Sequence, residues 1–115
     1  MPDTHQAYTL PAISAKEALS RHSAGAILID LRKTAARQAD GRAIEGAKIR
    51  DPFFFEHDDP LTRETRPLVA FCVHGREVSQ FGCAMLLLHG CDAVYVRGGF
   101  EALVAAGASL QELEA

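Results

Sequence analysis

Three short runs of consecutive apolar residues divide the chain, at 26–29, 68–71 and 93–96. Each run is too short for a helix, and none shows the polar alternation of a strand with one solvated face. Each is therefore predicted to be a buried, central strand of a parallel sheet. Between these runs, apolar residues recur at helical spacing, most clearly over 76–88. Strands that alternate with helices predict an α/β fold with right-handed crossovers.

The ends of the helices carry local signals. Ser14 with Glu17 matches a capping box, and Ser109 with Glu112 repeats the pattern, which predicts a C-terminal helix. Gly90 suits the position after the last turn of the helix at 76–88.

Shorter stretches complete the expected architecture. Residues 34–39 favour a short helix, and the region after Phe100 favours another. Residues 48–49 are expected to begin a short strand. The first nine residues are expected to form an arm, with an edge strand over 8–10.

Bulk composition limits the functional classes. The length of 115 residues fits one domain, and 48% apolar with 23% charged residues is ordinary for a soluble protein. A net charge of -3 without blocks of like charge gives no support for binding nucleic acid or a membrane surface. The three cysteines make a poor disulfide framework and suit a reducing compartment. No secretory signal is visible at the N-terminus, so a cytoplasmic location is expected.

The stretch 68–79 carries the strongest chemical signal. Cys72 follows an apolar strand directly, a loop containing Gly75 comes next, and the long helical pattern then begins. The carboxyl end of a parallel strand is where an α/β sheet usually binds its ligand. Backbone N–H groups of the loop and the following helix N-terminus favour a thiolate and can hold an anion. We therefore interpret Cys72 as a nucleophile; the alternative is a buried apolar cysteine that ends a core strand. Its expected cradle consists of Val73, His74, Gly75, Arg76 and Glu77.

A charged pair follows the first apolar run. Asp30 and Arg32 stand at the carboxyl end of this predicted strand and are candidates for a second part of the site. The favoured alternative for Asp30 is a local role, because short carboxylates often accept hydrogen bonds from nearby N–H groups. Arg32 would then be a surface charge.

Other reactive or aromatic residues have simpler interpretations. Three consecutive phenylalanines at 53–55 favour packing under a loop, although some could wall a pocket or form an exposed patch. His57 lies among acids, but a solvated turn is favoured over a metal site because no second ligand cluster is near in sequence. Cys83 fits core packing, and Cys91 with His89 gives too few ligands for zinc.

Taken together, these segments resemble the single-domain form of the rhodanese (sulfurtransferase) homology domain, over roughly residues 12–107. The resemblance implies a three-layer α/β/α fold around a mostly parallel sheet of about five strands. Four pieces in order carry it: Leu28-Ile29-Asp30-Leu31-Arg32, the turn from Gly41 to Ala47, the Cys72 loop with Gly75, and Tyr95 to Leu103 with its Gly98-Gly99 pair.

The sequence also departs from the family pattern. Arg42-Ala43 stands where the family usually has a histidine, Glu45 replaces a proline, and Leu103 replaces a tryptophan. The loop reads Gly75-Arg76-Glu77-Val78-Ser79 rather than Gly-x-Arg-Ser, which leaves the direction of Arg76 and the choice of substrate open.

The resemblance implies a persulfide mechanism that needs no cofactor or metal. The Cys72 thiolate would take the outer sulfur from a small anionic donor such as thiosulfate and pass it to cyanide, a small thiol or a protein cysteine. Arg76 and Arg32 are candidates to attract the donor, and His74 is either a pocket donor or an exposed loop histidine. Glu77 is expected to turn away, because a carboxylate facing the pocket would repel a dianion. Residues expected to shape the site without reacting are Asp30 and Gly98.

Two rival functions stay open. A phosphatase or arsenate reductase of the Cys-x5-Arg kind shares the cradle, but it needs an arginine where this chain has Val78. A docking or regulatory module is the other rival, although rhodanese-like modules of that kind often lack the cysteine that is present here.

Overall fold

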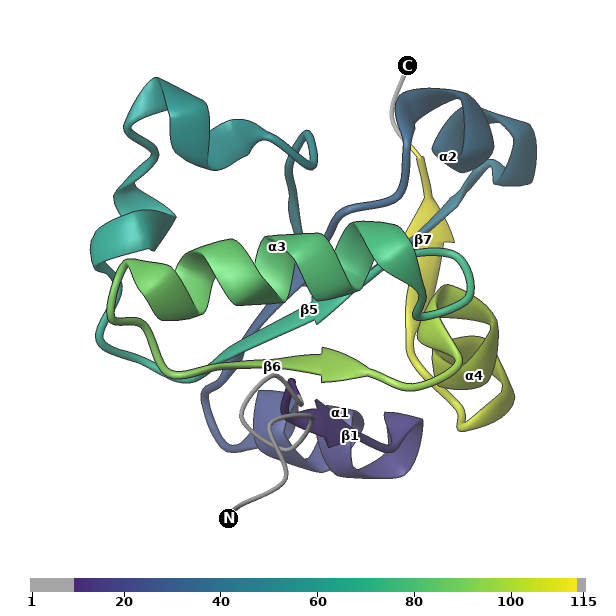
Figure 1. The fold of residues 1–115 in the computed structure, drawn as a ribbon. Helices are drawn as coiled ribbons and strands as arrows, with labels where there is room; N and C mark the ends of the chain where they lie inside the picture. The colour runs from purple at the N-terminus through teal and green to yellow at the C-terminus, as the bar shows by residue number, and fades with distance from the viewer. Residues whose placement is uncertain (1–9, 114–115) are drawn as a thin grey trace, which may run out of the picture.

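The computed structural model describes residues 10–113, apart from the side chains of Glu56 and His57. A five-stranded sheet forms its centre, in the order β1-β6-β5-β2-β4, and every pair of neighbouring strands is parallel. This α/β architecture confirms the predicted class (Figure 1). The strands of the sheet are β1 (Ala12–Ile13), β2 (Ile27–Asp30), β4 (Lys48–Ile49), β5 (Leu68–Phe71) and β6 (Ala93–Val96).

Helices cover both faces of this sheet and make three layers. Helices α1 (Ala15–Ser23) and α4 (Gly99–Ala105) pack on one face. Helix α3 (Glu77–Leu88) packs on the other, together with 3-10 helices at Phe54–His57 and Pro60–Arg63. Figure 1 shows α3 on one side of β5 and β6, above them in this view, and α1 on the other side, below them. The short helix α2 (Thr34–Asp40) follows β2.

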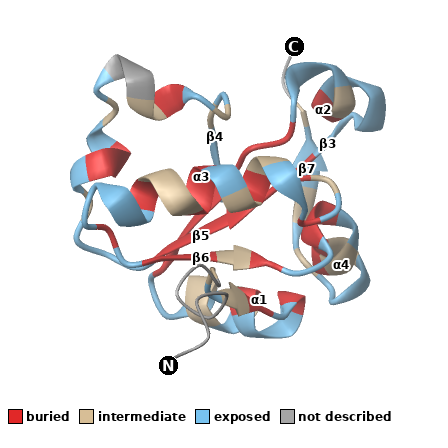
Figure 2. Ribbon diagram, viewed as in Figure 1, coloured by how far each residue is buried: buried red, intermediate tan, exposed pale blue. Residues whose placement is uncertain are grey.

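Alternation along the strands explains why the apolar runs are continuous. Leu28, Val69 and Val94 face the core under α1 and α4, whereas Ile29, Ala70 and Ala93 face the core under α3. Successive side chains of a strand point to opposite faces, so a strand buried on both sides has no polar position. Figure 2 shows β5 buried along its length and the outer helix surfaces exposed.

The C-terminal helix expected from Ser109 and Glu112 is wrong. This segment forms β7 (Leu110–Glu112), which pairs antiparallel with β3 (Arg42–Ile44). The ladder is extended by two bonds, from Glu45 N to Ser109 O and from Leu113 N to Gly41 O. A capping pattern is a local preference, and here tertiary pairing outweighs it because β3 gains a partner for its backbone groups.

The first capping box forms in part. The Oγ of Ser14 accepts a hydrogen bond from Glu17 N at 3.1 Å, as expected for an N-cap. The Glu17 carboxylate accepts instead from Nε of Arg21, one turn later.

At the N-terminal end of the described residues, β1 forms one edge of the five-stranded sheet. Most of the edge strand expected over 8–10 lies outside the described residues; the observed edge strand is β1, which pairs with β6. Among the helices in the described part, none combines the length and the apolar character needed to span a bilayer.

Candidate active site

The site lies at the carboxyl edge of the sheet, where β5 and β2 end side by side. Asp30 of β2 is in register with Phe71 of β5, and Leu31 N donates a hydrogen bond to Phe71 O. Because the strands are parallel, the residues that follow them emerge at the same edge. Cys72 and Arg32 are therefore neighbours in space.

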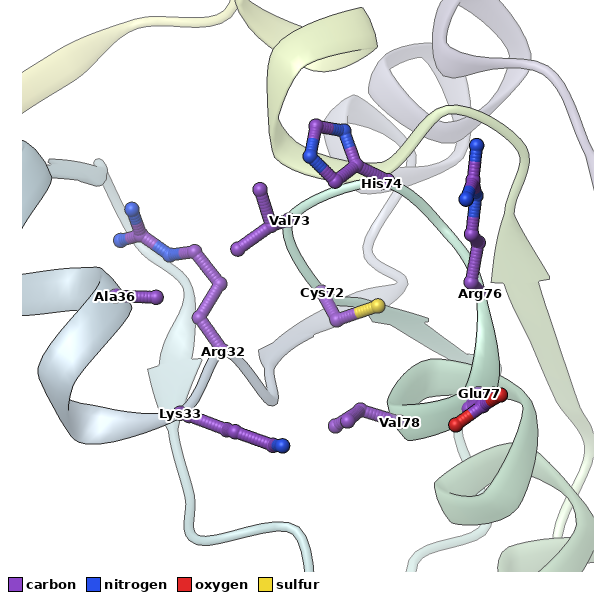
Figure 3. Close-up of a pocket in the computed structure, with 9 residues that line it drawn as sticks. All are labelled: Arg32, Lys33, Ala36, Cys72, Val73, His74, Arg76, Glu77 and Val78. Carbon is purple, nitrogen blue, oxygen red and sulfur yellow. The ribbon is translucent and has the colours of Figure 1, made fainter.

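Cys72 lies at a pocket and not in either core. Its side chain is only 6% exposed, yet it belongs to neither apolar cluster of the protein. It lines a pocket of about 280 Å³. Figure 3 shows its sulfur inside the curve of the loop that runs from Val73 to Glu77. The Cys72 Sγ lies 3.3 Å from Oγ of Ser79.

The backbone of this loop has free donors. Within the part of the chain that the structure describes, none of the N–H groups of residues 73–76 donates a hydrogen bond. The N-terminus of α3, a helix of 12 residues, follows directly and adds the unpaired N–H groups of its first turn. Unpaired backbone donors around a reactive sulfur can bind an anion.

Two glycines allow this loop to lie against the loop after β6. Gly75 has φ +70° and Gly99 has φ +58°, which are both in the left-handed region. A Cβ on Gly99 would lie 2.6 Å from Gly75 N and would also clash with Cys72 O. Phe100 N donates a hydrogen bond of 2.7 Å to this same Cys72 carbonyl. Gly98, expected to shape the site, is the N-cap of α4 and has φ +80°.

At the end of β2, the structure shows a buried ion cluster. Asp30 is fully buried and accepts hydrogen bonds from N, Nε and Nη2 of Arg32 at 2.9–3.1 Å. The expected local bonding of Asp30 is therefore confirmed. Nε of Arg37 lies 3.8 Å from the same carboxylate, and the Arg32 guanidinium stacks 3.9 Å above the Phe100 ring.

The cluster changes the role of Arg32. Its side chain is 1% exposed, so the interpretation as a surface charge is wrong. Arg32 does line the pocket, but Figure 3 shows its guanidinium directed away from Cys72. The ion pair with Asp30 holds the guanidinium in place, so Arg32 does not reach for a donor anion.

His74, Arg76 and Glu77 all line the pocket. Nδ1 of His74 lies 3.3 Å from the Glu101 carboxylate, and the histidine is largely exposed. Arg76 is the N-cap residue of α3, and its guanidinium has no acidic or hydrogen-bonding partner among the described residues. The expectation that Glu77 turns away from the pocket is wrong: it occupies the first turn of α3, where the helix dipole favours a carboxylate.

Sequence reasoning missed several residues of the site. Ser79 is fully buried in the first turn of α3 and faces back to Cys72. The available signal in the sequence was its position seven residues after Cys72, in the first turn of the helix that follows the loop. Lys33, Ala36 and Val78 complete the pocket wall. Lys33 follows the ion cluster at the end of β2, and only the pairing of β2 with β5 brings it near Cys72.

The phenylalanines at 53–55 divide between two environments. Phe54 is buried in the core under α3, as expected. Phe53 is 50% exposed and lies 5.5 Å from the ring of Phe81, measured between ring centroids. Both rings line a second pocket of about 370 Å³.

The other two cysteines lie in the core under α3. Burial raises the pKa of the Cys83 thiol to about 11, and burial also raises the pKa of Cys91. Over the described residues, no group of three His, Cys, Asp or Glu side chains is arranged to bind a metal ion. The side chain of His57 is outside the described residues, so its interpretation as a solvated turn stays a prediction.

Comparisons with known proteins place this geometry in a fold family. No protein-family model and no curated protein sequence matches the chain. Among solved structures, a Rhodopseudomonas palustris protein of unknown function, described as a possible tyrosine phosphatase, matches with a TM-score of 0.76 at 20% identity. This match covers 89% of this chain and 85% of that one. A rhodanese-like domain protein from Staphylococcus aureus matches with a TM-score of 0.73 at 21% identity, over 91% of this chain and 100% of that one.

A larger enzyme contains the same fold. Thiosulfate sulfurtransferase from Pseudomonas aeruginosa matches with a TM-score of 0.72 at 20% identity, over 90% of this chain but 20% of the enzyme. The matches extend over about nine-tenths of this chain and so define the class of its α/β fold. The chain has the rhodanese-like fold, as the sequence resemblance predicted. At these identities the similarity describes the fold and leaves the reaction to be argued from the site.

Proposed function

We propose that the protein is a sulfurtransferase that carries sulfane sulfur as a persulfide on Cys72. The observation that carries this proposal is the position of Cys72. Its sulfur lines a pocket inside a loop whose N–H groups at 73–76 have no hydrogen-bond acceptor among the described residues. A structural cysteine needs no such environment, whereas a thiolate and a persulfide anion both do.

The proposed reaction has two steps. The Cys72 thiolate attacks the outer sulfur of thiosulfate, a Cys72 S–S bond forms, and the S–S bond of thiosulfate breaks so that its electron pair leaves with sulfite. The persulfide anion remains on the enzyme. An acceptor such as cyanide then attacks the outer sulfur and forms thiocyanate. The S–S bond to Cys72 breaks, and its electron pair stays on Sγ as the thiolate. This is covalent catalysis with ping-pong kinetics.

Each part of the loop has a role in this scheme. The free N–H groups would hold the charge on the outer sulfur, as an oxyanion hole holds a developing oxyanion. The Cys72 thiol donates a hydrogen bond to the Ser79 hydroxyl at 3.3 Å, and this hydroxyl donates to Arg76 O. Once Cys72 is a thiolate, the hydroxyl can turn and donate to Sγ instead. Arg76 supplies an unpaired positive charge at the pocket and would attract the anionic donor.

The test is sulfur transfer from thiosulfate to cyanide by wild-type protein and by Cys72→Ser. We expect transfer by the wild type and none by Cys72→Ser. Mass spectrometry after thiosulfate treatment should find one added sulfur atom on Cys72. Cys83→Ala serves as the matched control, because Cys83 is buried in the core under α3 and should leave both results as in the wild type. Equal transfer by Cys72→Ser would end the proposal.

Phosphatase chemistry is the nearest alternative, and the description of the Rhodopseudomonas palustris protein as a possible tyrosine phosphatase makes it worth testing. That chemistry needs an arginine fork six residues after the cysteine, to bind three oxyanion oxygens. Here the position holds Val78, whose apolar side chain lines the pocket. Hydrolysis of p-nitrophenyl phosphate that depends on Cys72 would favour this alternative.

A docking module without catalysis is the second alternative. Retention of Cys72 at the pocket argues against it, and absence of the added sulfur in the mass spectrum would support it.

The proposal includes a location in a compartment that keeps thiols reduced, such as the cytoplasm, because all three cysteines are free. The proposed substrates are a small anionic sulfur donor and a thiol or other sulfur acceptor.

A further inference from the structure

The pocket at Cys72 continues into a second apolar pocket. The first pocket ends at Lys33, Glu77 and Val78, and these same three residues also line the second. The two spaces therefore adjoin and form one groove along the N-terminal half of α3. Their volumes of about 280 Å³ and 370 Å³ together fall in the range of sites for small organic ligands, about 300–1,000 Å³. Thiosulfate or cyanide would fill only a small part of this groove.

Aromatic side chains form the far end of the groove. Pro52, Phe53 and Phe81 line it, and the two rings meet edge to face. Phe53 is 50% exposed and Phe81 is 42% exposed, although phenylalanine is normally buried. Phe55 packs against Phe81 from the side of the core, with 5.5 Å between ring centroids, and so supports the arrangement. A ligand with an aromatic ring could lie against these faces.

Positive charge lines the groove, from Arg76 at the Cys72 pocket to Lys33 at the junction with the aromatic end. Most arginines of the described structure are paired with acids, including Arg42 with Asp40, Arg50 with Asp59 and Arg66 with Glu64. Arg76 and Lys33, which line the groove, have no acidic partner among the described residues.

The remaining charges at the groove do not cancel this excess. Glu77 offsets one of the two unpaired cations. The buried cluster beneath the pocket has two arginines on the single carboxylate of Asp30 and so adds one positive charge. The groove thus has an apolar wall, a net positive charge and a sulfur nucleophile at one end.

We propose that the sulfur-exchange partner of Cys72 is a small organic thiol with an aromatic ring and a carboxylate. This inference rests on the proposed function and names the substrate class of the same site. The ring would lie on Phe53 and Phe81, and the carboxylate would pair with Lys33. The size of the groove favours a small molecule over a protein segment.

The exchange balances without an added oxidant or reductant. The thiolate of the partner attacks the outer sulfur of the Cys72 persulfide, and a new S–S bond forms on the partner. The S–S bond to Cys72 breaks, and its electron pair stays on Sγ as the thiolate. The proton of the persulfide, where present, stays with the transferred sulfur. The reverse reaction would load Cys72 from the persulfide of the same thiol.

The test compares two thiols and cyanide as acceptors on protein loaded with thiosulfate. One thiol is 2-mercapto-3-phenylpropionate, which carries its carboxylate next to the thiol and its ring at the far end, in the order of Cys72, Lys33 and the two phenylalanines along the groove. The other is 2-mercaptopropionate, which lacks the ring, and cyanide needs no groove. We measure the second-order rate of sulfur removal from Cys72. The ring-bearing thiol is expected to react about tenfold faster than the ringless thiol, which corresponds to about 1.4 kcal/mol of additional binding in the transition state.

Variants then locate the preference. Phe53→Ala combined with Phe81→Ala should reduce the ratio of the two thiol rates to about one to two. Leu88→Ala, on the same helix and 79% exposed, removes an apolar side chain outside the groove and should leave the ratio as in the wild type. A further acceptor, 2-phenylethanethiol, has the ring but no carboxylate. Lys33→Ala should remove the advantage of 2-mercapto-3-phenylpropionate over this thiol, whereas Lys16→Ala, on α1 at the opposite face of the sheet, should keep it.

The outcomes separate the two proposals. No transfer to cyanide would overturn the proposed function itself. Transfer to cyanide with equal rates for the two thiols, or a ring preference that survives in the double phenylalanine variant, would overturn only the groove inference. Faster transfer to an acidic cysteine-containing peptide than to the ring-bearing thiol would also overturn it, and would identify a protein acceptor.

Discussion

The ends of β2 and β5 are neighbours in the same sheet, but they use their polar groups in opposite ways. After β2, Asp30 and Arg32 bond to each other and are fully buried. After β5, the loop that follows Cys72 leaves its N–H groups without acceptors among the described residues, and its sulfur lines a pocket. One strand end is closed by its own partners, and the other is open to a ligand. A charged residue at the end of a buried strand is therefore weak evidence of function until its partners are known.

The carboxyl ends of β2 and β5 are also linked by contacts through Phe100. The Arg32 guanidinium stacks on the ring of Phe100, whose N–H donates to the carbonyl of Cys72. The ion cluster at the end of β2 thus holds Phe100, and Phe100 in turn holds the start of the Cys72 loop. Changes at the closed end should mainly affect stability, and changes at the open end should mainly affect turnover.

The largest effect on stability is expected from Asp30→Ala. This change leaves Arg32 and Arg37 as buried cations without a carboxylate, which typically costs about 3–5 kcal/mol. Urea denaturation followed by circular dichroism measures the loss. Asp40→Ala is the matched control: Arg42 lowers the pKa of Asp40 mainly through a side-chain hydrogen bond, but this pair is exposed and its loss should matter much less. Similar urea midpoints for the two variants would contradict the distinction between closed and exposed pairs.

A smaller loss of stability, with a severe loss of turnover, is expected from Gly99→Ala. A new Cβ would clash with backbone atoms of Cys72, Val73 and Gly75, and backbone displacement would distort the cradle. Backbone strain alone costs about 1–3 kcal/mol. Gly90→Ala separates strain from clash, because Gly90 has φ +85° but open space at its Cβ position. If both variants transferred sulfur from thiosulfate to cyanide equally well, close packing of the two loops would not matter for the cradle.

The central strands, the position of Cys72 and the bonding of Asp30 could be predicted from the sequence, because each follows from a local pattern. The runs at 26–29, 68–71 and 93–96 became β2, β5 and β6 with shifts of one residue at most. Cys72 was found because a strand, a glycine loop and a helix start are contiguous in sequence. The local bonding of Asp30 was also predicted, since its main partner is two residues away.

The C-terminal strand and the groove could not be predicted, because both depend on residues that are distant in sequence. β7 forms because β3 is available to pair with it, and no local signal competes with the capping pattern at Ser109. The groove beyond the pocket needs Phe53 and Phe81 to meet, which only the packing of the 52–57 segment on α3 achieves. Glu77 is an exception, because its surroundings are local: the favourable effect of the helix N-terminus on its carboxylate was expected, but its place in the pocket lining was not.

At the open end, Arg76→Ala should weaken binding of the donor without removing the nucleophile. Arg76 lines the pocket and has no acidic partner among the described residues. Loss of one partly solvated charge interaction of about 1 kcal/mol corresponds to a roughly fivefold higher KM for thiosulfate, with a smaller change in kcat. Steady-state kinetics with cyanide in excess gives both values. Lys16→Ala on α1 is the control for a change of net charge. An unchanged KM in Arg76→Ala would show that Arg76 does not bind the donor.

At neutral pH the smallest effect is expected at Cys83, a second thiol that is closed off in the core under α3. Burial raises the pKa of Cys83 to about 11, from an ordinary value of 9.0. Below pH 9 this thiol is protonated in both the folded and the unfolded chain. As the pH rises from about 9 to about 11, the unfolded chain releases the proton first, so the free energy of unfolding falls. Cys83→Ala removes the contribution of this thiol to the pH dependence of stability. The unfolding free energy of the variant should therefore fall less steeply than that of the wild type between about pH 9 and about pH 11, as measured by urea denaturation at each pH. Parallel pH profiles would mean that Cys83 ionises as readily in the folded protein as in the unfolded chain, and that this part of the interior is as open as the loop around Cys72.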